Sequence, residues 1–129
     1  MNLKPALTAP LFVALALSAQ AADPGPKASS ARQCFHSRDV NGFKAQDDQH
    51  VYVRVGVKDL YEFKLFGRCP DVDWTMRLGL VSRGGGFICS GLDADLLVPS
   101  PIGPQRCPVR EIRKLSPAEV AALPPKLRP

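Results

Sequence analysis

Apolar and polar residues alternate along the middle of the chain with the period of two that is typical of a half-buried β-strand. Residues 51–57 place valine at every second position, and residues 61–65 continue the alternation with aromatic residues and leucine. The charged pair Lys58-Asp59 stands between the two runs. Because a short polar break between two alternating runs favours a reversal of the chain, the sequence predicts a β-hairpin here.

Five further segments have the apolar character of short strands. They are residues 34–38, 74–80, 87–89, 96–98 and 107–112. Three glycines at 84–86 interrupt the apolar pattern, and we expect a hairpin turn there because glycine adopts positive φ freely. The aromatic residues Tyr52, Tyr61, Phe63, Phe66 and Trp74 could include a ligand-stacking platform, but at strand spacing most of them are interpreted as core.

A helix start signal follows the last predicted strand. Ser116, Pro117 and Glu119 provide an N-cap, a proline at the first helical position and the glutamate of a capping box. Leu115 is expected to pack on Val120 as a hydrophobic staple, and the pair of prolines further on must end the helix. The predicted fold is mainly β, a small antiparallel barrel or sandwich of about six short strands with one short C-terminal helix.

The N-terminal segment has the features of a secretory signal peptide. Residues 1–21 contain a lysine, a short apolar run and small residues at Ala19 and Ala21, after which we expect cleavage. A membrane anchor is disfavoured because the apolar run is shorter than the roughly 20 residues that span a bilayer. The rest of the chain is interpreted as a flexible leader (22–32), a single disulfide-stapled β domain (33–123) and a loose tail (124–129).

The net charge of +5 does not indicate a nucleic-acid partner. Several of the basic residues lie in the signal peptide, the leader or the tail, and charges of both signs alternate through the β domain. A nucleic-acid interface would need basic residues clustered on one face. We therefore expect an envelope protein or surface as partner, no nucleic acid, no transmembrane segment after signal cleavage, and a periplasmic or secreted location.

The cysteines, Cys34, Cys69, Cys89 and Cys107, lack the C-x-x-C spacing of zinc knuckles and thioredoxin-type sites. An even number of scattered cysteines in an exported chain favours disulfides. Three pairings are open, and we favour Cys34–Cys107 with Cys69–Cys89, which would join the start of the fold to its last strand and close a middle segment.

Candidate chemistry is sparse. The best carboxylate pairs are Asp93 with Asp95 and Asp71 with Asp73, which could hold Ca²⁺ or act as acid and base, although turn roles are favoured for both. The neighbours His36, Ser37 and Asp39 lack a nucleophile motif. The glycines at 84–86 lack the Lys-Ser/Thr of a phosphate loop. No catalytic residue, cofactor or metal ligand is predicted.

The cysteine frame resembles a family of small exported bacterial proteins known only as a domain of unknown function. The features that carry the resemblance are Cys34, the aromatic strand 61–65, Arg68-Cys69-Pro70, Cys89-Ser90-Gly91 and Cys107-Pro108-Val109. Leu92 separates Gly91 from Asp93, where the family has adjacent glycine and aspartate. The resemblance implies a compact β domain with disulfides and implies no activity.

Three functions follow as hypotheses. The first is a non-catalytic binding or structural module of the cell envelope. The second is a periplasmic inhibitor of a cell-wall hydrolase or other enzyme, since a preorganised loop binds at little ordering cost. The third is a calcium-binding or enzymatic domain that uses Asp93 and Asp95.

Overall fold

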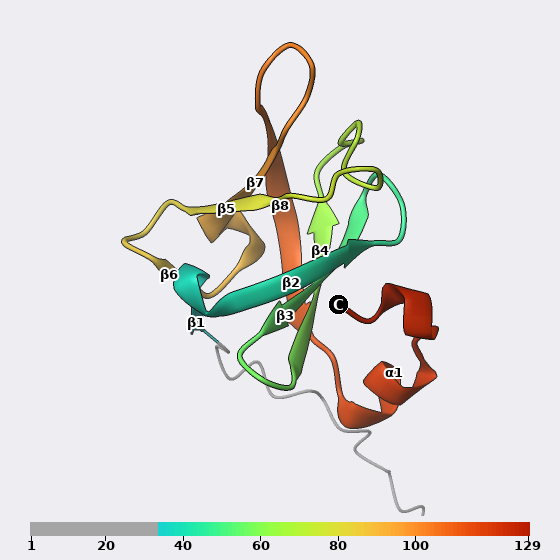
Figure 1. Ribbon diagram of the computed structural model, residues 1–129. Coiled ribbons are helices and arrows are strands. Elements are labelled where there is room, and N and C mark those ends of the chain that lie inside the picture. Colours follow the sequence, from blue (N-terminus) through green and yellow to red (C-terminus); the bar gives the residue numbers. More distant parts are fainter. Residues whose placement is uncertain (1–33) are drawn as a thin grey trace, which may run out of the picture.

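The computed structural model describes residues 34–129, which form two antiparallel sheets and short helices (Figure 1). With η for a 3-10 helix, the elements are β1 (Phe35–His36), η1 (Ser37–Asp39), β2 (Val40–Ala45), β3 (His50–Val55), β4 (Asp59–Leu65), β5 (Gly79–Ser82), β6 (Phe87–Ile88), η2 (Gly91–Asp93), β7 (Ala94–Val98), β8 (Gln105–Lys114), α1 (Pro117–Ala122) and η3 (Pro125–Leu127). The predicted mainly β fold with one short C-terminal helix is confirmed. The predicted signal peptide (1–21) and leader (22–32) lie outside the described residues.

The larger sheet has six strands in the order β2-β3-β4-β8-β7-β5 and curls into a half-barrel. Every neighbouring pair is antiparallel, and β2 and β5 are the two edge strands. The smaller sheet consists of β1 and β6 alone. The half-barrel is therefore open along the side on which β2 and β5 lie.

The core fills the concave face of the half-barrel. The predicted hairpin is present as β3 and β4, and its register places Val51 opposite Phe63 and Val53 opposite Tyr61, all four buried. Because side chains alternate across a strand, these residues all point to the same face, where the inward residues of β7 and β8 meet them. The alternation over residues 51–55 and 61–65 therefore identifies the inner face correctly, whereas Val57, which continues it, lies in the turn and is exposed.

A second apolar cluster lies on the outer face of β3 and β4. Tyr52, Leu60 and Leu115 form it, and Val120 of α1 packs against it, as the predicted staple requires. The capping box is confirmed, since Ser116 Oγ accepts from the Glu119 N–H at 3.2 Å and the Glu119 carboxylate accepts from the Ser116 N–H at 2.7 Å. The helix thus begins where its sequence signal stands.

The C-terminal residues 124–129 are packed rather than loose. Leu127 of η3 joins the outer cluster, and the Arg128 guanidinium donates to the carbonyl oxygens of Ala121 and Leu123 at 2.7–3.0 Å. Pro124 and Pro125 end α1, as predicted, and they begin η3, which folds back toward β2 (Figure 1).

The strand predicted over residues 74–80 is wrong in its first half. Within this segment only Gly79 and Leu80, at the start of β5, pair with β7, and the register sets Gly79 opposite Leu97. Continuing that register backward would set Arg77 opposite Pro99, which stops β7 because proline has no N–H to donate. Trp74 and Met76 are consequently outside the sheet, with exposed fractions of 82% and 92%. Neither residue is core, and Phe66 is also half exposed.

The glycine segment 84–86 turns the chain, with positive φ at Gly85 and Gly86, but it does not close a hairpin. The strands on either side of it, β5 and β6, belong to different sheets. β6 pairs with β1 because the turn carries it away from β5 to the start of the fold.

The favoured disulfide pairing is wrong, because the structure joins Cys34 to Cys89 and Cys69 to Cys107. The β1–β6 register sets Phe35 opposite Ile88, and one step further it sets Cys34 opposite Cys89, with 4.1 Å between their Cα atoms. The second bridge ties the loop after β4 to β8. Spacing along the chain could not reveal that β1 and β6 form a ladder.

Candidate functional site

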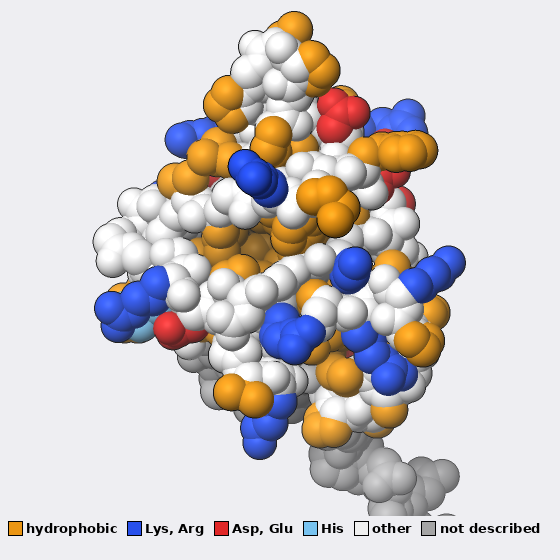
Figure 2. Space-filling model, viewed as in Figure 1, with side chains coloured by type: hydrophobic (Ala, Val, Ile, Leu, Met, Phe, Trp, Pro, Cys, Tyr) orange, Lys and Arg blue, Asp and Glu red, His pale blue; other side chains and the backbone are white. Residues whose placement is uncertain are grey.

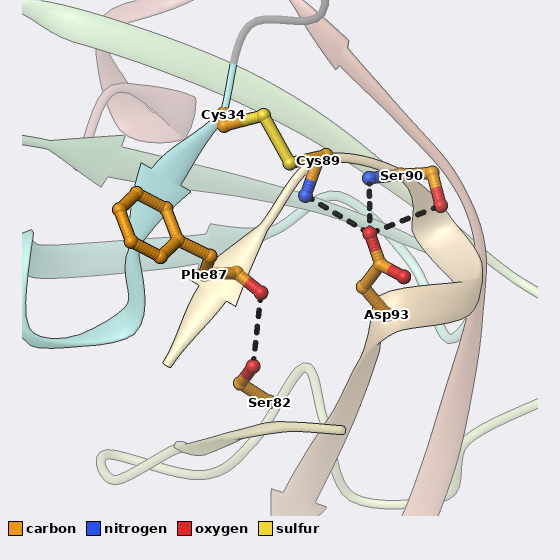
Figure 3. The surroundings of a disulfide bond; sticks show 6 residues. All are labelled: Cys34, Ser82, Phe87, Cys89, Ser90 and Asp93. Atoms are coloured by element: carbon orange, nitrogen blue, oxygen red, sulfur yellow. Dashed lines mark hydrogen bonds between the residues drawn. A yellow bond between two sulfur atoms is a disulfide. The ribbon is translucent and has the colours of Figure 1, made fainter. Parts of the chain in front are cut away.

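The first candidate pair from the sequence consists of Asp93 and Asp95, and the structure gives each a separate structural partner. Asp93 Oδ2 accepts from the backbone N–H groups of Cys89 at 3.0 Å and Ser90 at 2.9 Å, beside the Cys34–Cys89 bridge (Figure 3). These bonds, the Cys89 one first, hold the pKa of the Asp93 carboxyl below its usual range. The carboxylate therefore caps η2.

Asp95 lies on β7 and is completely buried. Arg83 Nε donates to its Oδ2 at 3.1 Å, and Arg106 Nη1 donates to the same oxygen at 3.2 Å. The hydrogen bond to Asp95 raises the pKa of Arg83 above its ordinary value. Both oxygens of Asp95 are occupied by guanidinium groups, so this carboxylate serves as a link between strands.

Asp71 and His36 are likewise used in the fold. Asp71 takes a left-handed backbone conformation, with φ of 67°, and its carbonyl accepts from the N–H of Trp74 and of Thr75. The His36 ring packs on Phe87 with 3.8 Å between ring centroids. Within residues 34–129, no three His, Cys, Asp or Glu side chains cluster as metal ligands would.

A concave feature lies along the open edge of β2. Two adjoining cavities of about 630 and 470 Å³ share Phe43 and Met76 in their linings. We call them together the edge groove, and Figure 2 shows the second as an apolar hollow between β5 and β2. Both volumes fall in the usual range for binding sites, about 300–1,000 Å³.

The hydrogen-bond pattern shows which backbone groups of β2 face the edge groove. The Gln46 N–H donates to the His50 carbonyl at 2.9 Å, which makes these two a bonded pair across β2 and β3. Bonded and non-bonded pairs alternate in an antiparallel ladder. Phe43 and Ala45 are therefore non-bonded positions, and their N–H and C=O groups point away from β3 toward the open edge.

One wall of the edge groove is the loop of residues 71–77. Its base is held by the Cys69–Cys107 bridge and by Val72, which is buried with the core. The two hydrogen bonds to the Asp71 carbonyl tighten the turn that follows. Trp74 and Met76 are thereby presented to solvent and to the groove on an anchored loop.

The opposite wall is the C-terminal segment. Pro124, Lys126 and Leu127 line the groove on the outer side of β2, and Pro129 packs over Gly42. Lys44 also lies on this side, because its register partner Tyr52 belongs to the outer cluster. The β2 edge is thus flanked by an apolar wall toward the core and by a mixed wall with two lysines on the outer face.

The charge of the edge groove is mainly positive. Lys44, Arg77 and Lys126 line it, and within the described part of the chain none of them has a carboxylate oxygen within 4.0 Å. Asp73, on the loop wall, is the one acidic residue of the lining. In Figure 2, lysine and arginine side chains lie around the apolar hollow.

Comparison with known proteins places the chain in a family. The model of a family of unknown function, DUF6491, matches residues 3–128. The chain belongs to this family. The predicted resemblance to a family known only as a domain of unknown function is therefore confirmed, and both disulfides fit its cysteine frame. No curated protein and no solved structure shows a significant match.

Membership of this family does not by itself assign a function to the chain. DUF6491 carries no activity that could be transferred to named residues of this chain. Among residues 34–129, no helix combines the length and the apolar character that crossing a bilayer requires. The edge groove is therefore the feature from which we infer a function.

Sequence reasoning missed the edge groove because it assigned Trp74 and Met76 to a strand. A signal for the loop was present: Pro99 and Pro101 stand where the partner strand would have to continue. Two flanking aspartates, Asp71 and Asp73, also favour a turn at this point.

Proposed function

We propose that the protein is an exported, non-catalytic binding module of the cell envelope that takes its ligand into the edge groove. The observation that carries the proposal is the exposure of Trp74 and Met76 on an anchored loop beside the free edge of β2. Large apolar side chains grouped around a concave site are typical of binding surfaces.

Export is supported by two independent features. Two disulfides stabilise the domain, and disulfides persist in oxidising compartments outside the cytoplasm. The sequence of residues 1–21 has the charge, the apolar run and the small residues of a cleavable signal. The two together support a periplasmic or secreted location.

Binding without catalysis is supported by the use that the fold makes of its carboxylates. Asp93 caps a helix and Asp95 joins two arginines, so both carboxylates already have structural hydrogen-bond partners. The groove itself is lined mainly by apolar residues, and its charged residues are two lysines, an arginine and Asp73.

The test combines fractionation with capture. Full-length protein produced in a bacterium should appear in the periplasm or medium, shortened by the signal peptide.

Immobilised Trp74→Ala and Met76→Ser variants should lose an envelope component that the wild type and the Ile102→Ser control both retain. Ile102 is equally exposed, on the β7–β8 connection, and does not line the groove. Equal retention by all variants would contradict the proposal.

A further inference from the structure

We infer that the ligand of the edge groove is an extended peptide that adds to β2 as an extra antiparallel strand, with apolar and acidic side chains in alternation. The inference rests on the proposed binding function and names the ligand class. Among residues 34–129 it combines three observations at one place, namely a sheet edge with no partner strand, two chemically different walls, and two lysines with no carboxylate oxygen within 4.0 Å.

The free edge supplies the main-chain part of the recognition. Phe43 and Ala45, two residues apart, each turn an N–H and a C=O away from β3. An antiparallel strand presents complementary groups at the same spacing, which is how extended peptides join exposed sheet edges. These bonds would satisfy backbone groups to which no group of residues 34–129 is hydrogen-bonded.

The two walls supply the side-chain part. Side chains of an added strand point alternately to the two faces of the sheet. Those on the inner face meet Val72, Trp74 and Met76, which favour apolar residues. Those on the outer face meet Lys44 and Lys126, which favour acidic residues. The alternation of the peptide is thus dictated by the alternation of β2 itself.

Asp73 gives a further reason why the peptide would pair with β2 in one register and not in the register shifted by one residue. It lies on the loop wall between Val72 and Trp74, so an acidic peptide residue turned toward this part of the wall would meet a like charge, and Arg77 lines only the second cavity. A peptide shifted by one residue would direct its acids to the loop and its apolar residues to the lysines. Such a shift is disfavoured on both sides, and the groove therefore selects one of the two faces of the peptide.

Two other occupants fit less well. A second copy paired through β2 would bring Lys44 and no acidic residue, because this strand contains none. Residues 22–32 of the same chain contain Pro24 and Pro26, which have no N–H to donate, and their basic residues would face the groove lysines. An acidic, alternating segment of another protein matches the groove better.

The first experiment measures binding of a synthetic peptide of alternating valine and glutamate to the disulfide-bonded protein. Trp74 is the single tryptophan of the chain, so its fluorescence reports directly on the groove. A peptide of the same composition in block order, and one methylated at the backbone nitrogens that face β2, are the controls. Loss of two main-chain bonds should weaken binding about tenfold or more. Equal affinity for the methylated or block peptide would overturn the inference.

Charge variants test the outer wall. Lys44→Glu with Lys126→Glu should weaken binding of the valine-glutamate peptide about fivefold or more and improve binding of a valine-lysine peptide. Lys58→Glu is the matched control, since Lys58 is exposed in the β3–β4 turn and does not line the groove. An unchanged preference between the two peptides in the double variant would overturn the charge assignment.

Amide hydrogen exchange identifies the edge that is used. The peptide should slow the exchange of the Phe43 and Ala45 amides and leave those of Leu80 and Ser82 unchanged. The latter point outward from the other edge strand, β5, because Arg83 and Asp93 form a bonded pair in that ladder. Protection at Leu80 and Ser82 instead would overturn the assignment to β2.

The apolar dye anilinonaphthalene sulfonate separates the inference from the proposed function. If the dye binds at the groove of the wild type and not of Trp74→Ala, while the valine-glutamate peptide does not bind, the binding function stands and the peptide inference fails. If neither probe changes the Trp74 signal, both fail.

Discussion

Arg106 reaches from β8 to place its Nη1 atom 3.2 Å from Oδ2 of Asp95, the one charged side chain in the described residues that is fully buried. Arg83, directly after β5, approaches the same carboxylate from the other side. A buried carboxylate is tolerated only when it is paired and hydrogen-bonded. The ion cluster therefore joins the three strands that end the sheet on the β5 side.

The Asp95 cluster predicts unequal costs of substitution. Either Arg83→Met or Arg106→Leu leaves one guanidinium on Asp95 and should lower the free energy of unfolding by about 1–2 kcal/mol. The double variant leaves a buried charge without a partner and should cost about 3–5 kcal/mol. Urea unfolding monitored by circular dichroism checks this. A double variant no less stable than either single one would show that Asp95 is hydrated.

Gly91 predicts a severe effect from one added methyl group. A Cβ at this position would overlap the backbone of Arg110 and Glu111 in β8. Backbone atoms within a strand cannot move aside as a flexible side chain can. Gly91→Ala should destabilise the fold by about 3 kcal/mol, the upper range for overpacking. Gly67→Ala is the control, because a Cβ there meets nothing within 4 Å. Thermal melts of the two variants should differ clearly, and a neutral Gly91→Ala would contradict the close approach of η2 to β8.

The two disulfides should differ in what their removal does to the groove. They enclose segments with sequence separations of 55 and 38, and chain entropy assigns each about 4 kcal/mol. Cys69→Ser with Cys107→Ser also releases the base of the Trp74 loop, whereas Cys34→Ser with Cys89→Ser does not. Fluorescence anisotropy of Trp74 should fall only in the first pair. Peptide mapping without reduction tests the pairing itself, and a Cys69–Cys89 peptide would contradict it.

Acid should destabilise the protein through Asp93. Its pKa is lowered in the folded state by the Cys89 and Ser90 N–H groups, so the folded protein binds fewer protons than the unfolded chain. The stabilisation is present above the unfolded pKa, near 3.8, and is lost as the pH falls through the lower folded value. Asp93→Asn should reduce the slope of stability against pH below about pH 4, the reference range for Asp. Asp73→Asn, on the loop, is the control, and equal slopes in both variants would contradict the assignment.

Calcium should leave the stability unchanged. Asp93 and Asp95 already accept hydrogen bonds from backbone N–H groups and from arginines, and a cation would have to displace them. We expect the same melting midpoint with calcium and with EDTA. A rise with calcium would favour the calcium-binding hypothesis over the assigned structural roles.

Local patterns account for much of this fold. The alternation of residues 51–65 predicts the central hairpin and its buried face, and Ser116 with Glu119 predicts the start of α1. Both features depend on contacts between residues close in sequence, on the period of side chains along a strand and on the hydrogen-bonding needs of a helix end.

Other features were decided only by tertiary structure. Cys34 bonds to Cys89 because β1 and β6 form a ladder, and Trp74 is exposed because the strand that it would join ends at Pro99. The edge groove itself exists because β2 and β5, far apart in sequence, end the same sheet without pairing. The sequence by itself determined which residues alternate, which cysteines were available and where a helix begins. Which strands meet, and which edge stays open, depend on long-range packing that no local pattern encodes.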